Sequence, residues 1–280
     1  MNSGKNPKYY QEDTVMRVFI SADIEGCAWT TAWEETQKGQ AEYPAAVRQM
    51  TAEVKAACEG AIAAGADYIL IKDAHGTSRN IDLSQLPKCC EVIRGGNSSP
   101  ITMVEGIDGS FDAVMFVGYH SAAGRNGNPL SHTYTKSTTS IRLNGEPCSE
   151  FLLYSYACAL AQVPTVFLSG DKMLIDDSEG LHPKLVSVAV KDGLGGYTRC
   201  KQPDYACDLI REGAEKALKQ DLKGALCSVP EHFVYEVSFK EHARAVRASY
   251  YPGFVQVDSH TVRMETDNLM EVLRSIPFVL

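Results

Sequence analysis

The chain has 280 residues, of which 44% are hydrophobic and 22% charged, a composition typical of a folded globular protein. This length suits one large domain or two closely packed ones, with enough interior for a sizeable core. The formal net charge is −8. We therefore expect neither a nucleic acid nor an anionic membrane as a partner, because no excess of positive charge would offset the repulsion.

The N-terminal residues and the cysteines indicate a cytoplasmic protein. Residues 1–14 are polar and lack the apolar segment of a signal peptide, and we expect them to form a flexible tail. No apolar run approaches the roughly 20 residues that a membrane-spanning helix needs. The 9 cysteines are odd in number and no pair has CxxC spacing, so we interpret them as reduced thiols rather than a disulfide framework.

The first part of the chain alternates between strand and helix patterns. An apolar run at residues 17–22 predicts a strand, and a helical pattern of apolar residues follows from Pro44 to Gly65. A second apolar run at 68–71 completes a strand–helix–strand unit, which favours parallel pairing of the two strands. Apolar runs and a helical pattern predict four further elements, strands at 113–117, 163–168 and 186–190 and a helix at about 150–161.

The pattern changes after residue 195. Residues 203–220 have the pattern of an amphipathic helix, and strand patterns at 233–239 and 254–257 precede a final helix. Asn144-Gly145 is a common two-residue hairpin turn. We predict an α/β protein whose largely parallel central sheet is flanked by helices. Its expected parts are the tail (1–14), a main catalytic domain (15–195) and a smaller C-terminal α/β lobe packed on the main sheet (196–280).

Two carboxylates follow the first predicted strand. Asp23 and Glu25 are separated by one residue, and side chains at this spacing on an extended chain point to the same side. Two like charges that close repel each other unless a proton, an arginine or a cation lies between them. Carboxylates are also common in turns and helix caps, which is the alternative without any chemistry.

The next buried strands also end in polar residues. His75 follows the strand at 68–71, and His120 follows the strand at 113–117. Ligands of open parallel sheets bind beyond the carboxyl ends of the strands, so these histidines are predicted to lie near Asp23 and Glu25.

Two histidines and two carboxylates are ligands suited to zinc. Glu150 adds a third carboxylate at the start of a predicted helix, and with five ligands two metal ions become possible. A histidine after a strand more often makes a turn hydrogen bond, and a glutamate at a helix start can simply favour the helix dipole. The coincidence of three strand ends favours the metal site.

Other functional motifs are missing. The glycine-rich run at residues 193–196 lacks the spacing of a dinucleotide-binding loop and does not follow the first strand, so we expect no dinucleotide cofactor. The sequence also has no P-loop, no GxSxG elbow and no HExxH motif. The remaining histidines are expected to be surface or structural residues: His182, His232, His242 and His260.

Six short motifs stand out between residue 17 and the C-terminus. They are Ser21-Ala22-Asp23-Ile24-Glu25-Gly26, Asp73-Ala74-His75, Met103-Val104-Glu105-Gly106, Gly118-Tyr119-His120, Leu130-Ser131-His132-Thr133 and Asn144-Gly145 through Glu150. In order and spacing the chain resembles the M55 family of D-aminopeptidases over nearly its whole length. Six motifs in register are far more specific than any one of them.

The resemblance implies a dizinc aminopeptidase, associated with dipeptide transport, that forms a ring-shaped homo-oligomer. Its expected substrates are short peptides containing D-amino acids, or amino-acid amides. It also implies a catalytic histidine at His132. The implied zinc ligands are Asp23, bridging two ions, Glu25, His75, His120 and Glu150.

We therefore expect hydrolysis of an N-terminal peptide or amide bond by a metal-activated water, with His132 passing a proton to the leaving amine or stabilising the tetrahedral intermediate. Two alternatives stay open. One is a zinc amidase or deacylase that acts on a non-peptide amide. The other is a non-catalytic metal- or peptide-binding protein.

Overall fold

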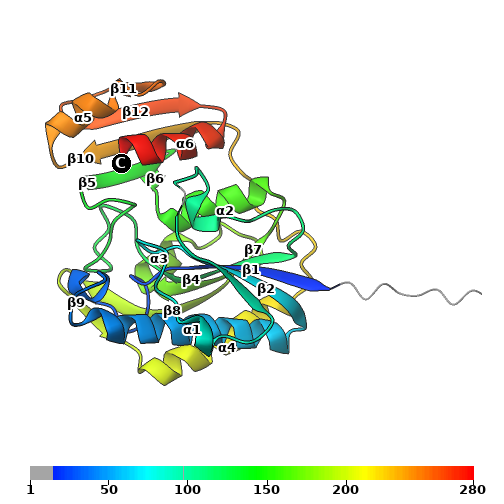
Figure 1. The fold of residues 1–280 in the computed structure, drawn as a ribbon. Helices are drawn as coiled ribbons and strands as arrows, with labels where there is room; N and C mark the ends of the chain where they lie inside the picture. The colour runs from blue at the N-terminus through cyan, green and yellow to red at the C-terminus, as the bar shows by residue number, and fades with distance from the viewer. Residues whose placement is uncertain (1–14, 97) are drawn as a thin grey trace, which may run out of the picture.

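The computed structural model describes residues 15–96 and 98–280, and the tail predicted at 1–14 lies outside the described residues. Within these ranges the main sheet has seven strands in the order β3-β2-β1-β4-β7-β8-β9 (Figure 1). The strands are β1 (Met16–Ala22), β2 (Ala66–Asp73), β3 (Cys90–Ile93), β4 (Ala113–Tyr119), β7 (Thr165–Asp171), β8 (Val186–Leu194) and β9 (Tyr197–Cys200).

The pairing in the main sheet is parallel from β3 to β8, and only the β8–β9 hairpin is antiparallel. Its central strands are buried on both faces. In β1, Val18 and Ile20 pack into one hydrophobic core, whereas Phe19 packs into the other. This burial explains why the sequence of β1 is a continuous apolar run rather than an alternating one. The predicted α/β fold with a largely parallel sheet is confirmed.

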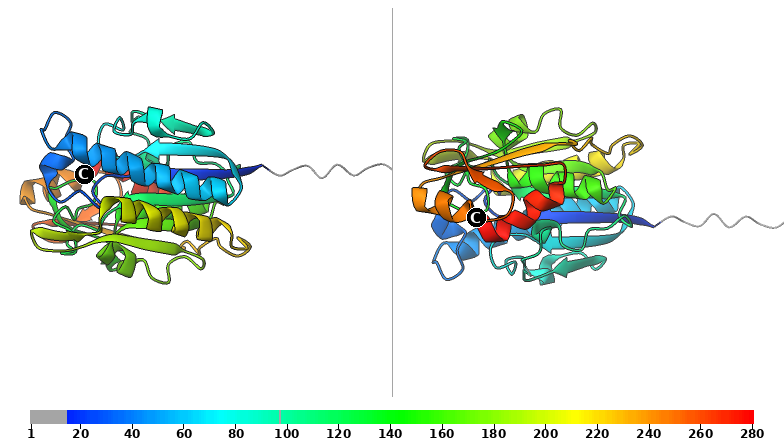
Figure 2. Two further views of the ribbon diagram at one scale, coloured as in Figure 1. Left: turned by 90° about the horizontal axis from the view of Figure 1, so that it is seen from below. Right: turned by 90° about the horizontal axis from the view of Figure 1, so that it is seen from above.

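Helices cover both faces of the main sheet. One face carries α1 (Tyr43–Ala63) and α4 (Pro203–Leu218), which pack side by side (Figure 2, left). The other face carries α2 (Glu150–Leu160) and α3 (Lys172–Asp177). The loops contain three short 3-10 helices, η1 (Trp33–Glu35), η2 (Leu83–Gln85) and η3 (Thr102–Val104).

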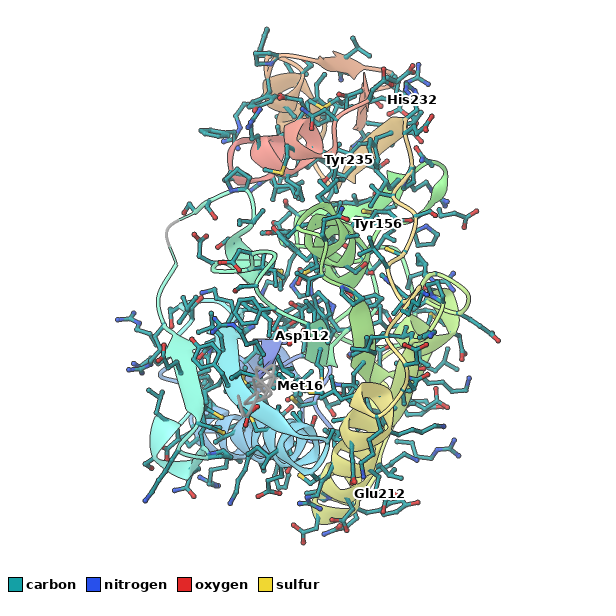
Figure 3. All side chains as sticks on the ribbon, turned by 90° about the vertical axis from the view of Figure 1, so that its right-hand side faces the viewer. Met16, Asp112, Tyr156, Glu212, His232 and Tyr235 are labelled. Carbon is teal, nitrogen blue, oxygen red and sulfur yellow. The ribbon has the colours of Figure 1, made fainter. Side chains whose placement is uncertain are left out.

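A second, antiparallel sheet lies beyond α2 (Figure 1). In the described residues it has five strands in the order β11-β12-β10-β5-β6. Helix α6 packs between this sheet and α2, and Figure 3 shows Tyr235 of β10 beside it. The elements are β5 (Thr138–Leu143), β6 (Glu146–Pro147), β10 (Phe233–Phe239), β11 (Phe254–Gln256), β12 (Thr261–Thr266), α5 (His242–Ala248) and α6 (Leu269–Val279).

The two sheets draw strands from both sides of residue 195, the boundary suggested by the change of sequence pattern. β9 and α4 follow this residue, yet β9 pairs with β8 and α4 packs on α1. β5 precedes it and pairs with β10. Pairing between segments as far apart in the chain as β5 and β10 cannot be predicted from a local sequence pattern. The domain division itself stays a prediction.

The orientation of the main sheet determines where its strands deliver polar residues. Figure 3 looks at the amino ends of the strands, where Met16 begins β1 and Asp112 precedes β4. The carboxyl ends of β1, β2 and β4 therefore all lie at the opposite edge. None of the helices in 15–96 and 98–280 is long and apolar enough for a membrane span.

Candidate metal centre

The carboxyl ends of three adjacent strands bring together four predicted site residues. Asp23 and Glu25 follow β1, His75 follows β2 and His120 follows β4. His75 Nδ1 lies 2.9 Å from Glu25 Oε2 and 3.3 Å from Asp23 Oδ1. His120 Nε2 lies 3.4 Å from Asp23 Oδ2. The two oxygens of Asp23 thus face different histidines.

The other two predicted residues, Glu150 and His132, complete the cluster. Ser149 caps α2 by accepting the N–H of Leu152, which places Glu150 in the first turn. Glu150 Oε2 is 3.6 Å from His120 Nε2, and its Oε1 is 3.9 Å from His132 Nε2. The rings of His120 and His132 stack with centroids 4.3 Å apart. All six predicted residues therefore meet at one edge of the sheet.

Close backbone contacts fix the loops that carry the carboxylates and His120. The N–H of Asp23 donates to the carbonyl of Val117 at 2.9 Å, and that of Gly26 to the carbonyl of Gly118 at 2.7 Å. Gly26 has no room for a side chain, because a Cβ there would lie 1.8 Å from the Tyr119 carbonyl oxygen. Gly118 has φ +73°, and a Cβ there would lie 2.3 Å from the Asp23 carbonyl oxygen.

Each site histidine uses one ring nitrogen to hold its orientation. The bonds run from His75 Nε2 to the Thr36 carbonyl at 2.9 Å, from His120 Nδ1 to the Ser121 carbonyl at 3.0 Å and from His132 Nδ1 to the Leu130 carbonyl at 2.8 Å. A carbonyl only accepts, so the bonded nitrogen carries the hydrogen. The other nitrogen faces the carboxylates. In a neutral imidazole this nitrogen has no hydrogen and carries a lone pair that can bind a metal. Metal-binding histidines are commonly held in this way.

The electrostatics of the cluster favour positive charge. Burial raises the pKa of Asp23 to about 7, and the neighbouring Glu25 adds to this effect. Burial would also raise the pKa of Glu25, but the charge of the neighbouring His75 brings it well below its ordinary value. Burial opposes the charged form of His120, yet Glu150 and Asp23 outweigh it and raise its pKa to about 10. At His120 the carboxylates thus outweigh desolvation and favour the charged imidazole.

The donor set fits a divalent metal. Among the described residues, three buried ligand atoms lack a hydrogen-bond partner, namely Asp23 Oδ2, Glu25 Oε2 and His120 Nε2. The 2.9 Å contact of Glu25 Oε2 with His75 lacks hydrogen-bond geometry. The potential ligand atoms form two groups, and within each group all atoms lie within 4.8 Å of one another. The groups are Asp23–Glu25–His120 and His120–His132–Glu150. Carboxylate oxygens and imidazole nitrogens are the ligands of zinc sites.

The cluster lines a cavity of about 840 Å³, a volume in the range of small-ligand sites. Its lining includes the carboxylates of Asp23, Glu25 and Glu150 and the apolar side chains of Leu273 and Ile276 of α6. A short polar substrate can therefore reach the carboxylates with an apolar surface beside it.

A buried network that the sequence analysis missed supports Glu25. Lys191 Nζ donates to the carbonyls of Glu25 and Thr30, each at 2.5 Å. Asn128 Nδ2 donates to the same Glu25 carbonyl and to Asp171 Oδ2, each at 3.1 Å. Asp171 is the last residue of β7, and Lys191 immediately follows the predicted strand at 186–190. The signal in the sequence is the position of each residue, Asp171 shortly after the apolar run at 163–168 and Lys191 directly after the run at 186–190.

A second missed network fixes the loop of His75. The Asp73 carboxylate accepts three hydrogen bonds. Asn80 donates from its backbone N–H at 2.6 Å and from its Nδ2 at 2.7 Å, and Ile81 donates from its backbone N–H at 2.9 Å. Asn80 Nδ2 also donates to the His75 carbonyl at 2.8 Å. Asp73 belongs to one of the six motifs, and its role is to hold the turn that presents His75.

Comparison with known proteins agrees with this geometry. The family model for peptidase M55, described as D-aminopeptidase, matches residues 16–278. The chain belongs to the M55 family. The resemblance predicted from the six motifs is thus confirmed, and this M55 chain is a peptidase of the D-aminopeptidase type.

A relative known from its sequence and a solved structure, both from Bacillus subtilis, are similar to this chain. A D-aminopeptidase of strain 168 is 26% identical over 263 residues, which cover 93% of this M55 chain and 95% of the relative. A solved structure is described as Zn-dependent D-aminopeptidase DppA, a self-compartmentalizing protease. It matches with a TM-score of 0.87 and 24% identity over 94% of this chain and 96% of that one. The likeness to that structure extends over both sheets and shows a shared fold.

Proposed function

We propose that this M55 protein is a zinc-dependent aminopeptidase that releases the N-terminal residue from short peptides containing D-amino acids. The observation that carries the proposal is the set of imidazole nitrogens turned toward three buried carboxylates beside a cavity. Family membership supports the reaction, and the zinc dependence stated for the B. subtilis structure supports the metal.

The proposed site holds two zinc ions per chain. Asp23 is the proposed bridge, since its two oxygens face different histidines at 3.3 and 3.4 Å. Glu25, His75, His120 and Glu150 are the other proposed ligands. When bound, such ions supply a deprotonated water and polarise the scissile carbonyl.

His132 is the proposed proton carrier. It lines the cavity with Nε2 turned toward Glu150, while its Nδ1–H is held by the Leu130 carbonyl. The stacked ring of His120 and the edge of Trp33, whose centroid is 5.1 Å away, fix its position. In this position Nε2 can accept a proton and donate it to the departing amine.

We also propose that the chain assembles into a closed homo-oligomer in the cytoplasm, with a peptide or amino-acid amide as its small-molecule partner. The B. subtilis protein is described as self-compartmentalizing, which supports assembly. Light scattering at micromolar concentration should give a mass several times that of the 30.6 kDa chain. A monomer that is fully active would contradict the assembly.

The reaction is tested with D-amino-acid amides that have a free or an acylated amine. An aminopeptidase should hydrolyse D-alaninamide and leave N-acetyl-D-alaninamide essentially untouched at the same zinc concentration. Faster turnover of the N-acetylated compound would favour the amidase or deacylase alternative. Turnover of neither, nor of any short peptide, would favour a binding protein.

A further inference from the structure

The proposed metal ligands lie between two cavities rather than at the end of one. The larger cavity, about 840 Å³, extends toward α6. A smaller one of about 480 Å³ opens beside η1. Glu25, His75, His132 and Tyr134 line both. A peptide bound with its scissile bond at the ligands would therefore place one end in each cavity.

The smaller cavity is cationic on its outer side, where Lys38 and Lys136 line it. The ammonium of Lys136 lies 4.4 Å from the ring centroid of Trp33, and this ring contacts His132 edge to face at 5.1 Å. One indole ring thus separates the ammonium from the proposed proton carrier. The lysine ion pairs found in the described ranges involve neither Lys38 nor Lys136. Two unpaired lysines beside a carboxylate-lined site are notable in a chain of net charge −8.

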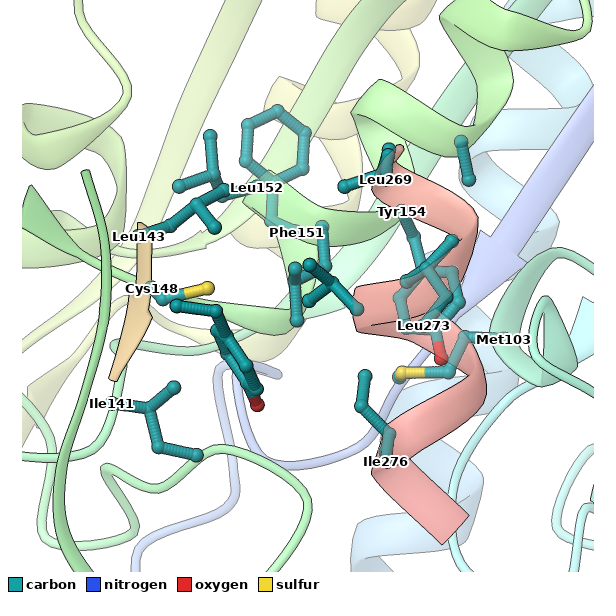
Figure 4. Close-up of a cluster of buried hydrophobic side chains, with 14 of the residues drawn as sticks. Met103, Ile141, Leu143, Cys148, Phe151, Leu152, Tyr154, Leu269, Leu273 and Ile276 are labelled. Carbon is teal, nitrogen blue, oxygen red and sulfur yellow. The ribbon is translucent and has the colours of Figure 1, made fainter. Parts of the chain in front are cut away.

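The larger cavity has a different lining. No lysine of the described ranges lines it, and its carboxylates, Asp23, Glu25 and Glu150, are proposed metal ligands. Tyr154 of α2 and Leu273 of α6, which Figure 4 shows gathered with Met103 and Ile276, provide apolar surface. Lys38 and Lys136 would repel the ammonium of a substrate and attract its carboxylate. The N-terminal residue therefore belongs in the larger cavity, and the departing part of the peptide in the smaller one.

We infer that Lys136, assisted by Lys38, binds the free C-terminal carboxylate of the substrate. This inference rests on the proposed aminopeptidase reaction. One residue of extended chain spans about 3.5 Å, so one or two residues after the scissile bond extend past His132 toward the ammonium on Trp33. The preferred substrates are accordingly di- and tripeptides with a free carboxylate. Arg79 lines the larger cavity and is the cation that a reversed orientation would use.

The test compares D-alanyl-D-alanine with D-alanyl-D-alaninamide, which differ only in the terminal charge. Wild type should prefer the acid in kcat/KM. Lys136→Gln should lower the acid-to-amide ratio about tenfold, mainly through KM of the acid, because the lost contact is made before and during reaction alike. Lys136→Arg should keep the ratio within about twofold of wild type. Lys88→Gln, an exposed lysine that lines neither cavity, is the matched control.

Circular dichroism and thermal melting should show that each variant is folded. An unchanged ratio in Lys136→Gln overturns the inference, and so does a ratio that falls only in Arg79→Gln. Calorimetric binding of the two ligands to zinc-depleted wild type and zinc-depleted Lys136→Gln gives the same comparison without turnover. Absence of turnover with a preserved binding preference would refute the proposed reaction but not the carboxylate site.

Discussion

Asp23 is the residue on which the proposed metal centre depends most. It is 2% exposed and its oxygens face both His75 and His120. Asp23→Ala should lose at least one zinc ion per chain and nearly all activity, because the remaining ligands lose their shared carboxylate. Elemental analysis of purified protein measures this loss. Glu231→Gln, a surface change, is the control, and full zinc occupancy in Asp23→Ala would refute the bridging role.

His132 differs from the proposed ligands because it comes from a loop rather than a strand end. Burial and the neighbouring His120 lower its pKa. Its Nε2 lies near Glu150 and could also serve a metal, since His120, His132 and Glu150 form one ligand group. If it carries a proton, His132→Ala should retain zinc and fold, lower kcat by roughly 10²–10⁴ and leave KM nearly unchanged.

Zinc analysis and steady-state kinetics on the same His132→Ala preparation separate the two roles. A variant that loses zinc would make His132 a ligand. A variant with the kcat of wild type would remove it from the mechanism.

His182 is a structural histidine that links stability to pH. It is 4% exposed, its ring packs against Phe151 with centroids 5.6 Å apart, and neither ring nitrogen has a partner among the described residues. Burial lowers its pKa to about 4. The unfolded state therefore binds the proton first as pH falls below about 6.5, and the free energy of unfolding should fall between pH 6.5 and 4.

The contribution of His182 to this fall is about 3 kcal/mol, from a pKa difference of some 2.5 between the two states. His182→Leu should show a correspondingly smaller loss in denaturant titrations at pH 7 and pH 4.5. Equal losses in wild type and His182→Leu would mean that other groups produce the acid sensitivity.

At the scale of elements, the site depends on the close approach of the loops after β1 and β4. Gly26→Ala would force a Cβ to within 1.8 Å of the Tyr119 carbonyl oxygen, so one backbone must shift. We expect a loss of about 1–3 kcal/mol in stability and weaker zinc retention. Gly196→Ala has nothing within 4 Å of the added Cβ and should be neutral. Urea denaturation of both variants measures the difference, and equal stability would contradict the packing described.

The sequence predicts the long buried elements well because their apolar runs reflect burial on both faces. It misses several short ones, although it predicts β11 and the Asn144-Gly145 turn between β5 and β6. α3 and α5 have only 6 and 7 residues, less than two full turns, which is too short for a repeating apolar pattern to show. β3 is half-exposed, and β5 pairs with β10, whose residues are far away in the chain. Such pairing leaves no local signal.

The residues of the candidate site also divide into those that a sequence pattern predicts and those that it does not. The strand-end rule predicts that Asp23, Glu25, His75 and His120 converge, because parallel strands end at one edge. His132 carries no such signal, and only the resemblance identifies it. Lys191 is the opposite case. It directly follows the strand predicted at 186–190 and lies inside β8, but its bond to the Glu25 carbonyl depends on the folded loop.

At the scale of the whole molecule, the ligands come from the main sheet and α2, while α6 beside the second sheet supplies an apolar wall of the larger cavity. The chain enters the second sheet at β5, returns to the main sheet at β7 and enters the second sheet again at β10. The second sheet therefore contributes to the larger cavity only through α6, which packs beside it. This arrangement links the chemistry of the ligands to recognition of the N-terminal residue.

The most direct test of the account is the stereochemical preference of one preparation with and without zinc. The values of kcat/KM for D-alanyl-D-alanine and L-alanyl-L-alanine are measured on protein as purified, after chelation and after zinc is restored. We predict activity that disappears on chelation, returns with zinc and favours the D-peptide at least tenfold. Equal rates for the two peptides, or full activity in the chelated protein, would contradict a zinc-dependent D-aminopeptidase.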